Sequence, residues 1–499
     1  MNTKISSNRQ EGVKNLLFLV VIILLLLPGI QGRFKIVKEP VLEGAYKQAE
    51  APSIDSLSVD SWFNGHFQEE YDQRLEQNIG FRSLLVKFNN QIDFSLFDKA
   101  NAEGVVVGKE NMLFEEDYIK EYLGMYYVGD SVWINKAIRL KQVQDTLNKI
   151  GKTLLVIFEP DKASVYPENI PNLYNLNSKK TSNYERLSAE LMANHINVLD
   201  LNKYFQSIKG KTEYPIFPQC GTHWSYYGAT FAADTSIRFI EKLMNVDLPE
   251  MKIVRNIALD VPRHPDYDIG LAMNLFFMIP HPKTADPVLD FSNNSSKKKP
   301  NALVVGDSFY FNWLNNGIPK NIFSTCDFWY YNNNITHNDG VQDGRAADLN
   351  FKDEIMKRDI IIIMITGRFM HAFAWGFDNQ LYDIFFPGKI APVEHFADAL
   401  RVYGNEFKRL YKESLEKGIT VNERIYMEAD YLFYEDMKNH PEKYSDKESL
   451  IKSYEISIRS TPEWMKDIER KAKLNKVSVD KQVRMDAEWL YQDKMKKQQ

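Results

Sequence analysis

Several classes of protein are excluded by what this 499-residue chain lacks. Its net charge is only −5, and its 62 basic and 67 acidic residues are interspersed through most of the sequence, so no basic surface for nucleic acid is expected. It has no CxxC and no HExxH arrangement, and the segment HPDYDIG, with Asp266 and Asp268, offers fewer oxygen ligands than a hard cation needs. We therefore expect neither a metal nor another cofactor.

Cysteine is also scarce, with only Cys220 and Cys326 present. In an oxidising compartment the two can form a disulfide bond. Two free, buried thiols fit the sequence equally well. Each cysteine lies close in sequence to a candidate catalytic residue.

One long hydrophobic run, LLFLVVIILLLLPGI, covers residues 16–30 and follows three basic residues that favour a cytoplasmic N-terminus. The run is shorter than the roughly 20 residues of a comfortable bilayer span, and no small-x-small cleavage site follows it. We favour an uncleaved signal anchor in residues 1–32 over a cleaved signal peptide, followed by an extended linker in residues 33–55. Either case predicts export. With the anchor, the chain is single-pass in the inner (cytoplasmic) membrane and its body lies in the periplasm.

The middle of the chain predicts an α/β domain over residues 56–380. GVVVGKENMLFEED predicts a short hairpin, and the helical spacing of apolar residues in 132–150 predicts a helix. Four apolar runs rich in branched residues are separated by helical patterns, which is typical of buried strands in a parallel sheet. They are TLLVIFEP from Thr153, INVLDL from Ile196, ALVVGDS from Ala302 and DIIIIMI from Asp359. The prediction is a three-layer domain, with a long irregular excursion outside the core between the second and third strands and a solvated loop at its SNNSSKKKP end.

Residues 381–499 have no strand-like runs and contain an internal repeat. KGITVNERIYMEADYLFYEDMK and NKVSVDKQVRMDAEWLYQDKMK align without gaps, and Thr420 and Ser478 can cap the helix in each copy. We expect an all-helical region in which the repeated helices bury an aromatic stripe and pack against each other. The region either covers the α/β domain or docks a partner.

Two polar segments point to chemistry. Ser308, in ALVVGDSFYFNWL, follows a buried strand and precedes a probable helix, so its hydroxyl is expected at the carboxyl edge of the sheet and its backbone amide beside a developing oxyanion. A serine hydroxyl needs a base, and His223, in PQCGTHWSYYGAT, lies on a loop before a helix. Taken alone, Gly-Asp-Ser is typical of an ordinary turn, and a His-Trp pair is more often a packing feature than a catalytic one.

Together, the THW segment and the later GDSF segment resemble the SGNH-hydrolase-like O-acetyltransferases of the alginate type, AlgJ and AlgX, also called DHHW proteins. The histidine precedes the serine, as in that family, and GKENMLF, EPDKASVYPENIP and ITGRF also match its pattern. The resemblance covers roughly residues 55–380. It implies acyl transfer to an exported polysaccharide, with Ser308 carrying the acyl group and His223 as general base and then acid. It also implies a membrane-bound O-acyltransferase as a partner that brings the acyl group across the membrane.

The chain departs from the family pattern two residues before the histidine, where Gly221 replaces the usual orienting aspartate. Another acid can substitute, and Asp200 and Asp307 are the candidates. A backbone carbonyl can orient the ring instead, or the site can be degraded and retained for binding. Candidate substrate-binding residues at the same edge are Arg368, Lys162, Tyr166 and Trp224.

The sequence thus predicts a membrane-anchored polysaccharide O-acetyltransferase with a serine-histidine mechanism. Two other functions stay open. A carbohydrate acetylesterase would use the same residues with water as acceptor, and a polysaccharide-binding scaffold of an exopolysaccharide system would not need Ser308.

Overall fold

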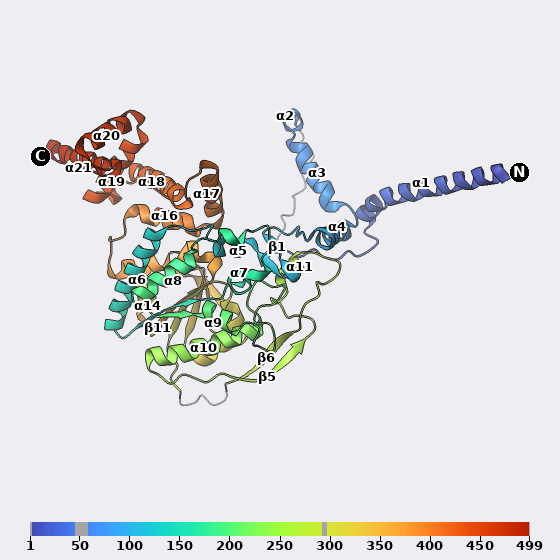
Figure 1. Cartoon of the computed structure of the whole chain (residues 1–499), viewed down its shortest axis with the longest axis horizontal. Helices are drawn as coiled ribbons and strands as arrows, with labels where there is room; N and C mark the ends of the chain where they lie inside the picture. Colours follow the sequence, from blue (N-terminus) through green and yellow to red (C-terminus); the bar gives the residue numbers. More distant parts are fainter. Residues whose placement is uncertain (1, 45–57, 292–296, 499) are drawn as a thin grey trace.

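A computed structural model describes residues 2–44, 58–291 and 297–498. Residues 45–55 of the expected linker and residues 292–296 of the expected SNNSSKKKP loop lie outside the described residues. The chain starts with helix α1 (Asn2–Phe34), which projects from the body in Figure 1. Its segment Glu11–Phe34 has a mean hydropathy of 2.6 and is long and apolar enough, by length and composition, to cross a membrane.

The core is a seven-stranded sheet in the order β10-β9-β8-β7-β11-β3-β4. The five strands from β8 to β4 are parallel, whereas β9 and β10 extend the sheet as antiparallel strands. The bounds are β3 Thr153–Phe158, β4 Val198–Asp200, β7 Ala302–Gly306, β8 Cys326–Tyr330, β9 Asn334–Thr336, β10 Gln342–Arg345 and β11 Ile360–Ile365. The four predicted strands are confirmed, because they are β3, β4, β7 and β11.

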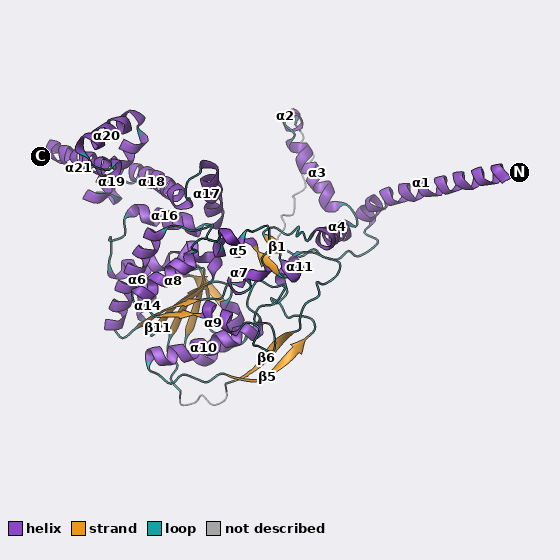
Figure 2. Cartoon of the chain, viewed as in Figure 1, coloured by secondary structure: helices purple, strands orange, loops and turns teal. Residues whose placement is uncertain are grey.

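Helices cover both faces of this sheet, which confirms the three-layer α/β prediction (Figure 2). Alternate residues of a strand point to opposite faces, so Leu154 and Val156 of β3 join one core and Leu155 and Ile157 join the other. The first core includes α6 (Asp130–Lys149), α8 (Asn183–Ala193), α14 (Phe351–Met356) and α15 (Phe377–Phe385). The second includes α5 (Glu116–Tyr122), α7 (Lys162–Val165), α9 (Leu201–Ile208), α10 (Tyr226–Met244), α12 (Tyr310–Asn315) and α13 (Ile318–Ile322).

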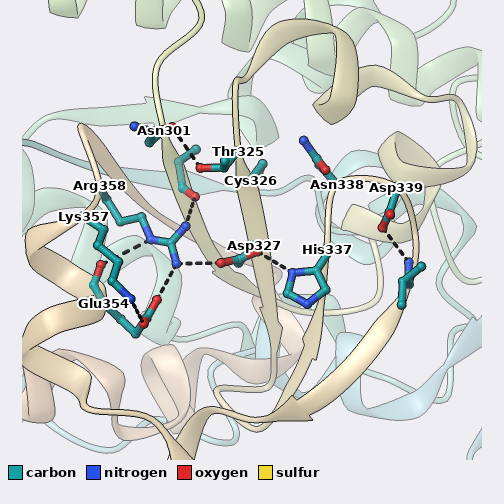
Figure 3. A network of polar contacts seen from close by, with 12 residues as sticks. Asn301, Thr325, Cys326, Asp327, His337, Asn338, Asp339, Glu354, Lys357 and Arg358 are labelled. Atoms are coloured by element: carbon teal, nitrogen blue, oxygen red, sulfur yellow. Dashed lines mark hydrogen bonds and ion pairs between the residues drawn. The ribbon is translucent and has the colours of Figure 1, made fainter.

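At the edge of the sheet where the parallel strands begin, a buried arginine is paired with two partly buried carboxylates (Figure 3). The Arg358 guanidinium, 4% exposed, lies 2.6 Å from both Asp327 Oδ2 and Glu354 Oε2. Asp327 Oδ1 lies 2.7 Å from His337 Nδ1 on the far side. This cluster ties the start of β8 to α14 and to the segment that enters β11.

Two small hairpins flank the core. β1 (Val105–Val107) and β2 (Leu113–Glu115) form the hairpin predicted for GVVVGKENMLFEED. β5 (Lys252–Leu259) pairs with β6 (Thr284–Asp290), and the connection between them holds α11 (Asp268–Ala272). The prediction that the excursion lies outside the core is therefore wrong in part, since Tyr267 and Ile269 are buried against the β1–β2 hairpin. Backbone hydrogen bonds hold this segment to the histidine loop, which is why it can enter the site.

Helices α2 (Val59–Phe63), α3 (His66–Asn78) and α4 (Arg82–Phe97) connect α1 to the body. The Gly80 N–H donates to the Pro28 carbonyl at 2.9 Å, which joins the α3–α4 turn to the last turns of α1. α4 is held to the body by side-chain hydrogen bonds from Lys87 and Asn90 to the 273–275 backbone.

The C-terminal region forms two three-helix units. α16 (Pro392–Val402), α17 (Gly404–Lys417) and α18 (Val421–Asn439) pack onto one face of the α/β core. α19 (Lys447–Ser460), α20 (Pro462–Asn475) and α21 (Val479–Gln498) enclose a core of their own. The first unit therefore covers the α/β domain.

The structure corrects the expected packing of the repeated helices. The two copies are α18 and α21, and Thr420 caps α18 in a capping box with Glu423. Each copy packs within its own unit, α18 against α16 and α21 against α19. The buried stripe is mainly aliphatic, with Ile425 in α18 and Val483 in α21, and Phe433 is its fully buried aromatic in α18, whereas Tyr431 and Trp489 are exposed.

Candidate active site

Ser308 lies directly after β7, in the turn before α12. β7 is fully buried between β8 and β11, so its carboxyl end has a fixed position in the sheet. A Cβ at Gly306 would meet Met364 of β11 at 3.1 Å, and this close packing leaves little room for a larger residue where the strand ends. Ser308 itself is partly exposed at the edge where ligands bind in open α/β sheets.

The structure brings His223 to this serine. His223 Nε2 lies 2.8 Å from Ser308 Oγ, a hydrogen-bond distance that suits proton transfer. The next residue, Trp224, fixes the geometry, because its indole N–H donates to the Phe309 carbonyl at 3.1 Å. The Asn312 side-chain amide donates back to the Trp224 carbonyl at 3.2 Å, so two bonds join the histidine and serine segments.

Asp268 is the acid on the other side of the imidazole. Its Oδ2 lies 3.2 Å from His223 Nδ1, while its Oδ1 accepts from the Thr222 N–H at 2.9 Å and from the Ile269 N–H at 2.7 Å. The Nδ1–H of a histidine that donates to a carboxylate leaves Nε2 as the acceptor, which is the tautomer a base needs. Ser308, His223 and Asp268 therefore have the contacts of a serine–histidine–acid triad.

Gly221 shows why the acid comes from another segment. A Cβ at this position would meet Pro218 Cγ at 2.7 Å and the Asp266 carbonyl oxygen at 2.8 Å, so no side chain fits without movement. The segment around Asp266 lies against the histidine loop, and the Gly270 N–H donates to the Cys220 carbonyl at 2.9 Å. The close packing of the two segments brings Asp268 to the ring.

The two acids proposed from the sequence do not orient the imidazole. Asp200 caps α9 through the Lys203 N–H and accepts from the Tyr184 hydroxyl. Asp307 is fully buried, and its carboxylate accepts from Thr366 and from the Phe309 N–H. Asp307 thus joins the end of β7 to the end of β11 and holds the serine turn.

A second buried carboxyl lies behind the same turn. Glu159 follows β3 and is 1% exposed, and burial together with the nearby Asp307 charge raises its pKa well above the ordinary value. Two ionised carboxylates at this position would repel each other, which favours the protonated form of Glu159.

Of the four proposed substrate-binding residues, Lys162 and Trp224 are buried and support the backbone of the site. Lys162 Nζ donates to three carbonyls of the histidine loop, those of Pro218 at 2.8 Å, Gln219 at 3.0 Å and Gly221 at 2.7 Å. Burial lowers its pKa to about 7. Neither side chain has a surface left for a polysaccharide.

The other two proposed residues have different surroundings. The Tyr166 ring packs edge-on against Phe217, and Lys209 Nζ lies 4.7 Å from the ring centroid. Arg368 is partly exposed, forms an ion pair with Glu115 and lines a cavity that Asp268 also lines. Arg368 is therefore the one of the four that the structure places in a cavity beside the triad.

The sequence does not identify Asp268 as the acid, because it lies 45 residues after His223 with no fixed spacing between them. The pattern of HPDYDIG suggests metal ligands and does not point to the histidine. Asp266 is buried, and burial raises its pKa to about 8, so only Asp268 is a carboxylate that reaches the histidine.

Cys220 and Cys326 are both free and buried.

Part of the chain is similar to known proteins. Residues 105–277 match the family described as "SGNH hydrolase-like domain, acetyltransferase AlgX". This match confirms the resemblance drawn from the motifs. It includes His223 and Asp268 and ends before Ser308.

The curated relatives are distant. A probable alginate O-acetylase AlgJ of Pseudomonas aeruginosa is 24% identical over 292 residues, which cover 55% of this chain and 72% of the relative. The corresponding protein of Pseudomonas syringae is 22% identical over 252 residues, covering 49% of this chain and 62% of the relative.

Two solved structures are also similar. The O-acetyltransferase domain of Pseudomonas putida AlgJ has 15% identity and a TM-score of 0.37, covering 56% of this chain and 99% of its own. Pseudomonas aeruginosa AlgX has 14% identity and a TM-score of 0.39, covering 57% of this chain and 67% of its own.

Proposed function

We propose that this chain is an O-acetyltransferase that acetylates a polysaccharide outside the cytoplasm through an acyl-serine intermediate. The observation that carries the proposal is the continuous contact from Ser308 Oγ through the His223 ring to Asp268. The match to an acetyltransferase family and the relatives described as probable alginate O-acetylases support acetyl transfer.

In the first half of the reaction, Ser308 Oγ attacks the carbonyl carbon of an activated acetyl donor. His223 Nε2 takes the hydroxyl proton as the oxygen–carbon bond forms, and the Asp268 carboxylate stabilises the imidazolium. The backbone amide of Ser308, at the end of β7, is the proposed donor to the oxyanion. Collapse of the tetrahedral intermediate breaks the bond to the donor, whose leaving group takes the proton from His223.

In the second half, a sugar hydroxyl replaces the donor. His223 Nε2 accepts the hydroxyl proton while the sugar oxygen attacks the acetyl carbon of the acyl-serine. The Oγ–carbon bond then breaks, and His223 returns the proton to Ser308. Acetyl groups are activated in the cytoplasm, so an exported enzyme needs a donor on its own side of the membrane, and we propose a membrane-bound O-acyltransferase as the partner that supplies it.

We propose that α1 anchors the chain in the inner membrane with the α/β domain in the periplasm. The length and hydropathy of Glu11–Phe34 support a single span. The hydrogen bond from Gly80 to Pro28 ties the body to the end of that helix. The serine would then face the compartment to which a polysaccharide is exported.

The acyl-serine is tested by treating the full chain in detergent with an activated acetyl ester or a serine-directed phosphonate and reading its intact mass. We expect one adduct on Ser308, and none in Ser308→Ala or His223→Ala. A wild-type chain that stays unmodified while folded would refute the mechanism and favour a binding scaffold. Acetate release with water, without transfer to any oligosaccharide, would instead identify a carbohydrate acetylesterase.

A further inference from the structure

Two adjoining cavities lie between the triad and the C-terminal helices. The first, of about 620 Å³, is lined by Asp268 and Arg368. The second, of about 320 Å³, lies between the segment after β11 and helix α17. Both are lined by Asp117, Arg368 and Lys408, so we treat them as one groove and call it the acceptor groove.

An aromatic wall borders the second cavity. Tyr331, Phe369 and Trp375 lie ring to ring, with centroids between 5.0 and 5.6 Å apart. Tyr331 and Phe369 are only partly buried, and both line the cavity. The C–H face of a pyranose packs on such rings, while its hydroxyls need polar partners around the edge.

The backbone that presents this wall adopts an uncommon conformation. Tyr331 and Asn332 have φ values of 52° and 53°, and Ala374 and Trp375 have φ values of 52° and 49°. The two strained pairs are joined by a bond from the Asn332 side-chain amide to the Trp375 carbonyl at 3.1 Å. Left-handed backbone at non-glycine residues costs free energy and is concentrated at ligand sites, so this wall has the signature of a binding surface.

A neutral hydrogen-bonding group also lines the second cavity. His371 is 9% exposed and stacks on Phe407 of α17 with ring centroids 3.9 Å apart. Burial lowers its pKa to about 3, which keeps the imidazole uncharged. Its Nδ1 is buried and has no hydrogen-bond partner among the described residues. The His371 ring therefore adds no positive charge to the second cavity.

The charges of the first cavity are predominantly negative. Its lining contains two cations, and both are neutralised, Arg368 by Glu115 and Lys408 by Asp117 at 2.8 Å. Burial raises the pKa of Asp117, but its bonds to Lys408 and Tyr126 outweigh that and hold the pKa below the ordinary value. The remaining charged lining residues are all carboxylates: Glu43, Glu103 and Asp268. These carboxylates would repel a polymer that carries a carboxylate on every sugar, and the described lining has no unpaired cation to bind such a polymer.

We propose that the acceptor groove binds an uncharged polysaccharide, whose sugars stack on the Tyr331–Phe369–Trp375 wall. Helix α17 of the C-terminal region forms its outer side. This inference rests on the proposed function, since it assigns the acceptor of that reaction. It predicts that charge repulsion disfavours a polyuronate substrate. It also predicts that α17, in the first C-terminal helical unit, takes part in substrate binding.

The test uses two hexasaccharides that differ only at C6, β-1,4-mannohexaose and the β-1,4-mannuronate hexamer. Binding to the full chain with Ser308→Ala is measured by calorimetry, so that turnover does not contribute. We expect mannohexaose to bind at least tenfold more tightly. Tighter or equal binding of the mannuronate, or no binding of either sugar at millimolar concentration, would overturn the proposal.

Two variants locate the binding. Tyr331→Ala should weaken mannohexaose binding at least tenfold, whereas Tyr431→Ala, on the exposed face of α18, should leave it unchanged. The double variant Glu43→Gln with Glu103→Gln should tighten mannuronate binding, and an unchanged mannuronate affinity would contradict the charge argument. An unchanged affinity in Tyr331→Ala would exclude the aromatic wall. Acyl capture by wild-type Ser308, measured separately, tells a failure of this proposal from a failure of the proposed reaction.

Discussion

Replacing Asp268 by asparagine tests the site most directly, because the structure defines what the new side chain would do. Oδ1 would keep its bonds from the Thr222 and Ile269 N–H groups, so the amide nitrogen would take the position of Oδ2, 3.2 Å from His223 Nδ1. An amide donates where the carboxylate accepted. His223 would then carry its proton on Nε2, facing Ser308 Oγ, and could not act as the base.

The magnitude follows from the geometry. Loss of the orienting acid in a serine protease triad costs roughly 10⁴ in rate. Here the acid–histidine distance of 3.2 Å is longer than that of a strong charge-assisted bond, and the Asp268 side chain is 23% exposed. We therefore expect kcat to fall by about 10² to 10³, which corresponds to about 3–4 kcal/mol at about 1.4 kcal/mol per factor of ten.

The assay is the rate of adduct formation on Ser308 and of acetyl transfer, at constant pH. Asp266→Asn is the matched control, because Asp266 lies two residues away, is 2% exposed and does not contact the imidazole. We expect that variant to stay within a few-fold of wild type. A kcat of Asp268→Asn within tenfold of the wild-type value, or an equal loss of kcat in both variants, would refute the triad.

Three further outcomes are expected. Burial raises the folded-state pKa of Asp266 to about 8 from an ordinary value of 3.8, so wild-type stability should fall as pH rises through that window, and urea midpoints between pH 5 and 8 should fall less in Asp266→Asn. Lys162→Met removes the donor to three carbonyls of the histidine loop and should lower both kcat, by about tenfold or more, and Tm. An unchanged kcat would contradict the role of Lys162 in positioning that loop. Arg358→Met leaves Asp327 and Glu354 facing each other without a cation and should lower the free energy of unfolding by about 3 kcal/mol in denaturant titrations. Ser308 should still form its adduct in the folded variant. A loss below about 1 kcal/mol would mean that the cluster behaves like a surface ion pair.

Much of the fold could be predicted because the signals are local. Branched residues in TLLVIFEP and DIIIIMI leave no polar face, which is typical of strands covered on both sides, and these runs form β3 and β11. The capping residue Thr420 sets the start of α18 through contacts within one turn. The packing of the C-terminal helices could not be predicted in the same way, because the helical period of apolar residues does not show which other helix their buried stripe contacts.

The sequence by itself determined the strands, the repeat, the hydrophobic N-terminal run and the two residues proposed to react, Ser308 and His223. Each depends on local composition or on a motif whose chemistry needs that residue type. Only the tertiary structure decided the acid, because Asp268 reaches His223 through the packing of Gly221 against the Asp266 backbone, a contact between distant segments with no sequence spacing to reveal it. The same reason applies to the groove, whose aromatic wall and carboxylates come from separate elements that meet only when the sheet and α17 have packed.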